Sequence, residues 1–316
     1  MTGIVDTIEK MAPVALIFGA GVVFARRKII DSSTSKAFSE FAFRFAIPAY
    51  LLGSLYSSNL SQVFNVTAIG AYAATALLAM VVVAIVARSV TGSSTRGTAL
   101  RIMSACQVNT AYFAIPVFIL LFGDASPIFP VILLQVCVLT VVVIAIMESA
   151  GSHNDVGVST PVKVRRGMLA ALTTPVVLAC YAGIATNVAN VPVPGWTLDA
   201  LSMAGAAASP VALFALGLHL GGAGLRFHGT TNDEYWLIGF KCVLFPLLTL
   251  AMSRYMFGLT GQWLSYVVLI AAMPAPQNLF IFAQQYDTEV ELAASVVVKT
   301  SIAALLLLPI WAVAAR

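Results

Sequence analysis

Residues 106–116 of this chain read CQVNTAYFAIP, and residues 271–279 read AAMPAPQNL. Each segment places proline and uncharged polar side chains inside an apolar stretch of about 20 residues, the length of a helix that crosses a bilayer. Proline removes a backbone donor and clashes with the preceding helical turn. In a bilayer, non-helical backbone is tolerated only where it is buried or lines a cavity. The sequence therefore predicts two membrane helices that break midway, at a polar site.

The composition supports a membrane protein. Of the 316 residues 60% are hydrophobic and only 9% are charged, whereas a soluble domain carries about 25% charged residues. This excludes a soluble enzyme and leaves no room for a separate soluble domain. Ten apolar runs predict an all-α fold of ten transmembrane helices, because a barrel would need shorter, alternating strands. The runs are residues 9–25, 38–57, 66–87, 100–122, 127–147, 167–188, 198–222, 235–257, 263–285 and 290–313.

The orientation follows from the placement of Lys and Arg, which are enriched in cytoplasmic connections. Eleven lie in the odd-numbered connections and three on the opposite side, which predicts that both termini lie on the outer side. The eleven are Arg26, Arg27, Lys28, Lys36, Arg88, Arg96, Arg101, Lys163, Arg165, Arg166 and Arg226; the three are Lys10, Arg254 and Arg316.

An internal repeat divides the chain. Pro13-Val14, Leu16 and Ala20-Gly21 recur 162 residues later as Pro175-Val176, Leu178 and Ala182-Gly183, and the same shift takes Pro48 to Pro210. We therefore expect a first five-helix repeat at 1–150, a cytoplasmic linker at 151–164 and a second repeat at 165–316. Because five is odd, the second repeat must enter the membrane upside down, as in many secondary transporters.

Polar groups inside the spans indicate the kind of substrate. Lys299, Lys241 and Arg44 fall within spans, whereas no Asp or Glu falls near a span centre. A cationic interior, together with the half-helix N-termini at the two breaks, favours an anion. For Lys299, binding of a substrate carboxylate and a structural hydrogen bond both stay open. Lys241 and Arg44 are expected to extend to the surface or to pair locally. Gln135 faces either the cavity or another helix.

The sequence contains no motif that is typical of metal binding, cofactor binding or hydrolysis. Cys106, Cys137, Cys180 and Cys242 all lie in apolar runs without CxxC spacing, so free thiols are expected and no metal or cofactor site is predicted. The chain lacks HExxH, GxSxG and paired intramembrane Asp residues, so we expect no enzyme. A net charge of +4 is not interpreted as nucleic-acid binding.

Several motifs, in this order and spacing, resemble the auxin efflux carrier family, which includes plant auxin exporters and bacterial malonate and malate permeases. They extend over nearly the whole chain. They are Phe45-Ala46-Ile47-Pro48, Asn109-Thr110 through Ile115-Pro116, Leu134-Gln135, Ser209-Pro210-Val211-Ala212-Leu213-Phe214-Ala215-Leu216-Gly217-Leu218, and Met273-Pro274 through Phe280-Ile281-Phe282-Ala283 and Tyr286.

The resemblance implies two inverted five-helix repeats in which helices 4 and 9 cross at their breaks. It also implies a homodimer, with a scaffold of spans 1, 2, 6 and 7 and a transport domain of spans 3–5 and 8–10 that moves as an elevator. Asn109 matches the asparagine that approaches the substrate carboxylate, and Pro116 and Pro274 match prolines of the two motifs. The sequence departs from plant members at Leu279, where they have the second crossover proline, since Pro276 lies three residues earlier. It also departs at Lys299, where they have a small residue.

These observations predict a secondary transporter of a small organic carboxylate, malonate-like, malate-like or auxin-like, in the bacterial inner membrane. The substrate-binding residues are expected to be Asn109, Thr110, Pro116, Gln135, Pro274, Gln277, Asn278 and Lys299. The expected partners are this anion, the lipid bilayer and a second copy of the chain, with no nucleic acid. The alternative is a passive anion channel or a membrane-embedded ligand sensor that uses the same pocket.

Overall fold

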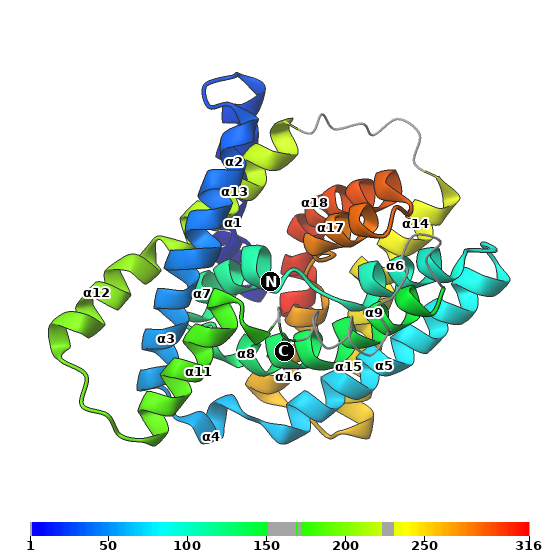
Figure 1. Ribbon diagram of the computed structural model, residues 1–316. Helices are drawn as coiled ribbons and strands as arrows, with labels where there is room; N and C mark the ends of the chain where they lie inside the picture. Colours follow the sequence, from blue (N-terminus) through cyan, green and yellow to red (C-terminus); the bar gives the residue numbers. More distant parts are fainter. Residues whose placement is uncertain (1, 151–168, 170–171, 223–230, 316) are drawn as a thin grey trace. The chain divides into compact units, whose positions relative to one another are not determined.

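The computed structural model describes residues 2–150, 169, 172–222 and 231–315, and every regular element in these ranges is helical (Figure 1). The expected linker at 151–164 lies outside them. Within these ranges six helical segments are long and apolar enough to cross a membrane, which makes the chain an integral multi-pass membrane protein. They are Val66–Ser89, Thr95–Phe122, Ser126–Ser149, Gly195–Gly222, Asn232–Met256 and Val290–Ala314. Shorter apolar helices cover Ala12–Arg26, Pro175–Val188 and Gly261–Ala271. Ten spans and an inverted repeat stay predictions.

The chain forms two compact units that alternate along the sequence. Unit 1 comprises the described parts of Met1–Asn65, Thr110–Pro130 and Thr173–Gly229, and unit 2 those of Val66–Asn109, Val131–Leu172 and Thr230–Arg316. The helices of unit 1 are α1 (Thr2–Arg26), α2 (Ser35–Phe41), α3 (Ile47–Ser57), α4 (Leu60–Val63), α7 (Ile115–Phe122), α11 (Pro175–Val188), α12 (Gly195–Ala206) and α13 (Ala208–Gly222). The helix α8 (Phe129–Leu134) begins in unit 1 and ends in unit 2.

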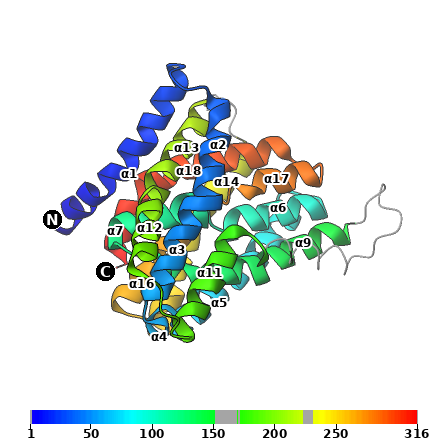
Figure 2. The same cartoon turned by 60° about the vertical axis from the view of Figure 1, so that its left-hand side comes forward.

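Small residues bring the helices of unit 1 together. The helices α1 and α13 lie side by side in Figures 1 and 2. A Cβ added at Gly221 would lie 2.7 Å from the carbonyl oxygen of Val22, and one added at Gly217 would overlap the carbonyl oxygen of Phe18. Such glycines allow two helix backbones to approach closely in a membrane. The contact between α1 and α13 therefore depends on the absence of side chains there.

Replacement of Gly217 by leucine is expected to lower the melting temperature of the purified protein, with a loss of about 2 kcal/mol, because backbone cannot move aside as a side chain can. Gly19 on α1 is the matched control, since an added Cβ there meets nothing within 4 Å. Equal melting temperatures for Gly217→Leu and Gly19→Leu would contradict this packing.

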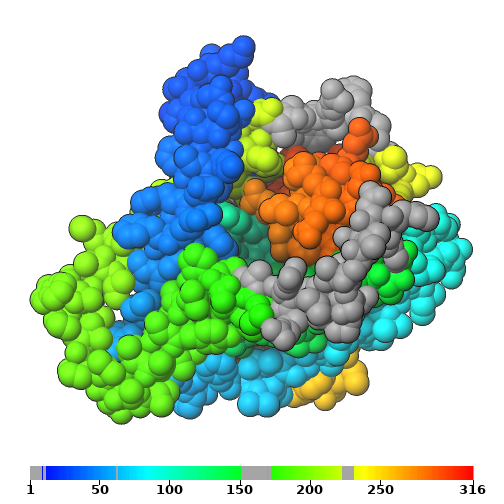
Figure 3. All heavy atoms as spheres, viewed as in Figure 1, coloured from blue at the N-terminus to red at the C-terminus, as the bar shows by residue number. Residues whose placement is uncertain are grey.

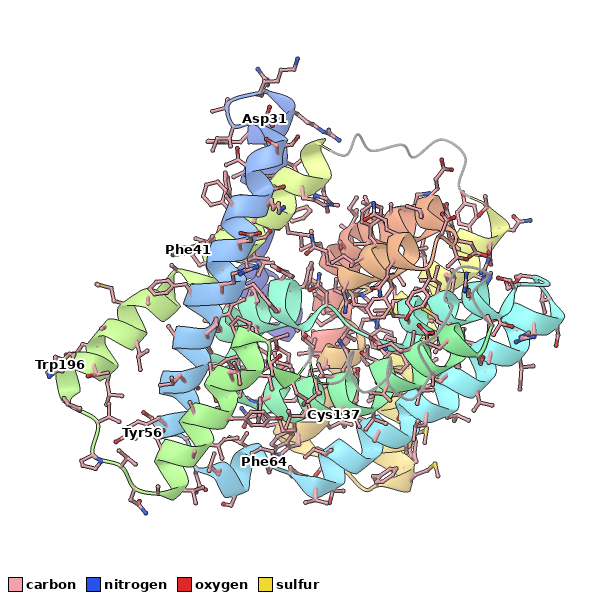
Figure 4. The ribbon with its side chains drawn as sticks, in the orientation of Figure 1. Asp31, Phe41, Tyr56, Phe64, Cys137 and Trp196 are labelled. Carbon is pink, nitrogen blue, oxygen red and sulfur yellow. The ribbon has the colours of Figure 1, made fainter. Side chains whose placement is uncertain are left out.

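Polar contacts fix the ends of α3 and α11. The surfaces of α3 (blue) and α11 (green) meet in the space-filling view (Figure 3). The Asn187 side-chain nitrogen donates to the carbonyls of Leu55, Tyr56 and Ser58, where α3 ends. The hydroxyl of Tyr56, labelled in Figure 4, donates to the carbonyl of Val191. These bonds satisfy carbonyls that a helix end leaves open.

Unit 2 contains the long helices α5 and α18 and the half-helices that build the site. Its helices are α5 (Val66–Ser89), α6 (Thr95–Cys106), α9 (Thr140–Ser149), α14 (Asn232–Gly239), α15 (Phe245–Ala251), α16 (Gly261–Ala271), α17 (Asn278–Gln285) and α18 (Val290–Ala314). Tyr72 of α5 is fully buried and packs edge-on against Phe245 of α15. The Trp311 indole of α18 donates to the carbonyl of Cys242, which ties α18 to the turn before α15.

A wide turn precedes each of three prolines. The π-helices Ala42–Ala46, Thr110–Ala114 and Phe240–Leu244 end two residues before Pro48, Pro116 and Pro246 respectively. In two of them the closing N–H donates five residues back, from Ile47 to Ala42 and from Phe245 to Phe240. A π-turn relieves the clash that proline makes with the preceding turn. The helix therefore continues through these prolines.

Candidate functional site

The fourth apolar stretch is interrupted at Gln107–Asn109. The helix α6 ends at Cys106, Gln107 is extended with φ −101° and ψ 161°, and helical structure resumes at Thr110. Pro116, one of the expected substrate-binding residues, lies outside this interruption. It lies in the first turn of α7, and the preceding π-turn accommodates its ring.

The side chain of Gln135 holds the first interruption. Its Oε1 accepts the N–H of Val108 and its Nε2 donates to the carbonyl of the same residue, both at 2.9 Å. Val108 is fully buried, so this amide replaces the two helical hydrogen bonds that the unwound backbone lost. Gln135 was expected to face either the substrate cavity or another helix. Its amide makes both of these hydrogen bonds with the backbone of Val108.

Gln107 is a buried residue of the interruption that the sequence analysis did not select as a site residue. Its side-chain Oε1 accepts a 3.2 Å hydrogen bond from the hydroxyl of Thr140, and the residue is 1% exposed. Its Nε2 has no hydrogen-bond partner in the described part of the chain. A buried amide donor without a partner calls for a water or a ligand.

The ninth apolar stretch is interrupted at 272–277. The helix α16 ends at Ala271 and α17 begins at Asn278, so Pro274 and Pro276 both lie in the gap. The N–H of Ala275 donates to the hydroxyl of Thr300 at 3.1 Å, and Thr300 is fully buried on α18. A side chain therefore satisfies the backbone of this interruption too.

The two interruptions touch each other within unit 2. The backbone N–H of Asn109 donates to the carbonyl of Pro274 at 2.9 Å, and Asn109 is 3% exposed. These residues lie 165 positions apart in the sequence, one in each expected repeat. This hydrogen bond places the unwound, polar backbone of both segments in one buried location.

The second half-helix presents an N-terminus without a side-chain cap. Gln277 is the N-cap residue of α17 and makes no capping hydrogen bond from its side chain. Its Oε1 is buried and without a partner among the residues that the structure describes, while Asn278 is exposed. The N-terminus of a helix carries partial positive charge and N–H donors, which suits an anion.

Thr110 and Pro116 belong to unit 1 and not to unit 2. Thr110 is half-buried and opens the π-helix that follows Asn109. Pro116 is buried, and its carbonyl accepts a hydrogen bond of 3.2 Å from the hydroxyl of Ser209 on α13. Both residues therefore lie in unit 1 and outside the two interruptions.

Lys299 lies beside the site but points to a carboxylate. Its Nζ is 2.6 Å from Oε2 of Glu234, and the side chains are 11% and 9% exposed. Glu234 also belongs to the capping box that Thr231 forms at the start of α14. The next residue, Thr300, is the one that contacts the interruption. The ion pair favours the structural reading of Lys299.

A Lys299→Gln variant is therefore expected to destabilise the protein by about 2 kcal/mol through the unpaired Glu234, and the double variant Lys299→Gln/Glu234→Gln is expected to recover most of that loss. Melting temperatures and transport rates of the two variants check this. If the double variant recovers its stability but binds the anion less tightly, Lys299 belongs to the substrate site.

Lys241 is fully buried, so of its two expected alternatives, extension to the surface and local pairing, the first is wrong. It lies in the π-helix before α15, and its Nζ donates to the carbonyl of Ala271, the last residue of α16, at 3.3 Å. Its ammonium also lies 4.7 Å from the centre of the Phe245 ring. Arg44, by contrast, is exposed.

A buried arginine joins three parts of unit 2. Arg101 of α6 is 5% exposed, forms an ion pair with Asp233 of α14 and approaches Oε2 of Glu289 at 2.5 Å. Glu289 immediately precedes α18 and has a left-handed backbone with φ +47°. From the sequence, Arg101 is predicted only to be one of the cytoplasmic charges. Its acidic partners lie more than 130 residues away, so local pattern gave no signal for them.

Comparison with known proteins agrees with a transport function. A family model described as "Membrane transport protein" matches residues 6–312. An "Uncharacterized transporter" of Methanothermobacter thermautotrophicus is 24% identical over 311 residues, covering 96% of this chain and 97% of that protein. A "Putative malonate transporter" of Rhizobium meliloti is 29% identical over 133 residues, 40% of this chain and 39% of that protein. The chain therefore belongs to the membrane transport protein family, which is the auxin efflux carrier family that its motifs resemble.

Proposed function

We propose that this protein is a secondary transporter that moves a small organic carboxylate across a bacterial inner membrane by alternating access. The observation that carries the proposal is the hydrogen bond from the N–H of Asn109 to the carbonyl of Pro274. It joins two interrupted membrane helices at one buried point. Discontinuous helices that meet at mid-membrane depth are a common substrate site in transporters.

The chemistry near this point suits an anion. Gln107 offers a buried amide donor without a partner in the described residues, and the N-terminus of α17 has no side-chain cap. Ion pairs with Arg101 and Lys299 occupy the acidic side chains of Asp233, Glu289 and Glu234. Donors without an adjacent free carboxylate favour a negatively charged ligand.

The substrate class rests on family membership and on this donor set. The relative from Rhizobium meliloti carries the name "Putative malonate transporter" and is 29% identical over 40% of this chain. We propose a malonate-like or malate-like dicarboxylate, with an auxin-like monocarboxylate as the next choice. Gln107, Asn109, Gln277 and Asn278 would hold one carboxylate group.

The division of the chain suggests how the site gains access to both sides. All four of these residues belong to unit 2. We propose that unit 2 carries the substrate as a rigid body, in an elevator movement, while unit 1 forms the fixed part and pairs with a second copy of the chain. Both termini would lie on the outer side of the membrane. Chemical cross-linking in native membranes tests the dimer.

Uptake of labelled malonate, malate and indole-acetate into proteoliposomes tests the function. Asn109→Ala keeps the backbone N–H but removes the side-chain amide, so it is expected to slow uptake about tenfold, the effect of one hydrogen bond to a charged group. Asn232→Ala is the matched control, because Asn232 is exposed at the start of α14. Saturable uptake with trans-stimulation supports a carrier. Single-channel currents would indicate a channel, and binding without flux a sensor.

A further inference from the structure

The last carbonyl of α16, that of Ala271, has an unusual hydrogen-bond donor. In a continuing helix the carbonyl of Ala271 would accept the N–H of Ala275, four residues on. That N–H instead donates to the hydroxyl of Thr300. The carbonyl of Ala271 accepts the ammonium of Lys241 in its place. A lysine therefore completes the C-terminal end of the first half-helix, at the start of the gap that contains Pro274.

The environment of this ammonium is free of acidic partners. Within the described ranges, the ammonium of Lys241 forms no ion pair with a carboxylate and donates one hydrogen bond, to the carbonyl of Ala271. The titratable side chains near it are the thiols of Cys106, the last residue of α6, and the neighbouring Cys242. The ring of Phe245 covers one side at 4.7 Å, a favourable place for a cation.

A half-helix C-terminus therefore contacts this cation, through the carbonyl of Ala271. The helices α6 and α16 both end where their stretches are interrupted, and a helix C-terminus carries partial negative charge. In transporters with broken helices, such C-terminal ends and unwound carbonyls are where a coupling cation is coordinated. Lys241 occupies that kind of position with a covalently attached cation.

We propose that the ammonium of Lys241 is a built-in cation that takes the place of a coupling sodium ion at the end of α16, so that anion transport needs no sodium. This rests on the proposed function. Because a fully buried cation without a carboxylate is costly, a negative substrate nearby would be favoured by the same charge. The N-terminus of α17 carries partial positive charge and the lysine carries a full positive charge, so both would attract the anion.

Sodium replacement tests the proposal on the wild-type protein. Proteoliposomes are prepared with sodium, potassium or N-methylglucamine on both sides, and initial uptake of labelled malonate is measured. Uptake rates within about twofold of one another are expected, since the cation is part of the chain. Uptake that appears only with sodium would overturn the inference while leaving the transport function intact. No uptake of any carboxylate in any salt would instead count against the proposed function.

Three variants test the residue itself. Lys241→Met keeps the length of the side chain and removes the charge, so uptake is expected to fall at least about tenfold, whereas Lys241→Arg retains most of it. Arg44→Met is the matched control, since it removes an intramembrane charge that is exposed. Wild-type uptake by Lys241→Met would overturn the proposal. If Lys241→Met does not fold, the sodium replacement decides alone.

A measurement on purified protein is independent of transport. Lys241→Ala leaves space for a small cation, so methylammonium chloride is expected to raise its melting temperature relative to an equal concentration of tetramethylammonium chloride. The wild-type protein should show no such difference. If neither methylammonium nor sodium raises the melting temperature of Lys241→Ala, the end of α16 is not a cation-binding position.

Discussion

Replacing Gln135 with leucine is expected to abolish transport and to lower the melting temperature of the purified protein. The amide of Gln135 satisfies both backbone groups of Val108, which is fully buried in the first interruption. Leucine has a similar size but leaves both groups without a partner. Each unsatisfied buried group costs about 1–3 kcal/mol, so a loss of about 3 kcal/mol is expected.

The control for this variant is Gln262→Leu. Gln262 is an exposed glutamine of the same unit, on α16, whose amide contacts the hydroxyl of Tyr266. Its replacement should leave uptake and melting temperature near the wild-type values. If Gln135→Leu transports at the wild-type rate, the bond to Val108 does not maintain the site and Gln135 has no positioning role.

Replacing Arg101 with methionine is expected to destabilise unit 2 by about 4 kcal/mol, the cost of removing one partner of a buried ion pair. The change leaves Asp233 and Glu289 without their shared cation and releases the contacts from α6 to α14 and α18. Thermal unfolding of the purified variant measures the effect. Uptake should fall with the fraction of folded protein.

Two further variants separate this effect from a general loss of charge. Arg88→Met removes an exposed arginine that contacts Thr95, and should change the melting temperature little. The triple variant Arg101→Met/Asp233→Asn/Glu289→Gln should recover part of the loss, because no uncompensated charge remains. A triple variant no more stable than Arg101→Met would contradict the ion-pair explanation.

The sequence was sufficient to predict the helical membrane fold and the location of both interruptions. Long apolar runs and polar residues beside proline are local signals, and they identified Asn109 and Pro274, which the structure joins through a hydrogen bond. The glycines of α13 that approach α1 are four residues apart, a spacing typical of helix packing in membranes. These features depend on neighbouring residues in the chain.

The roles of individual polar side chains depended on distant partners, which the sequence does not display. Gln135 was expected to face either the cavity or another helix, and its amide binds Val108, 27 residues earlier. For Lys299 a substrate carboxylate and a structural hydrogen bond both stayed open, and its partner Glu234 lies 65 residues before it. Lys241 was expected to extend to the surface or to pair locally, and nothing in its own span indicates the carbonyl of Ala271 as its partner.

Proline position alone was also a misleading guide to the first break. Pro116 follows a π-turn, as Pro48 and Pro246 do, and the wide turn lets the helix continue. The interruption instead begins at Gln107, and the side chain of Gln135 replaces the helical hydrogen bonds of Val108, the next residue. Helix breaks in a bilayer occur where side chains can satisfy the freed backbone, and that condition requires tertiary structure.

An experimental density map of the protein in a lipid nanodisc tests the central claim most directly. The account predicts that the polypeptide is non-helical at residues 107–109 and 272–277 and that the nitrogen of Asn109 lies within hydrogen-bonding distance of the oxygen of Pro274. Continuous helices through both segments, or segments too far apart for that bond, would contradict it.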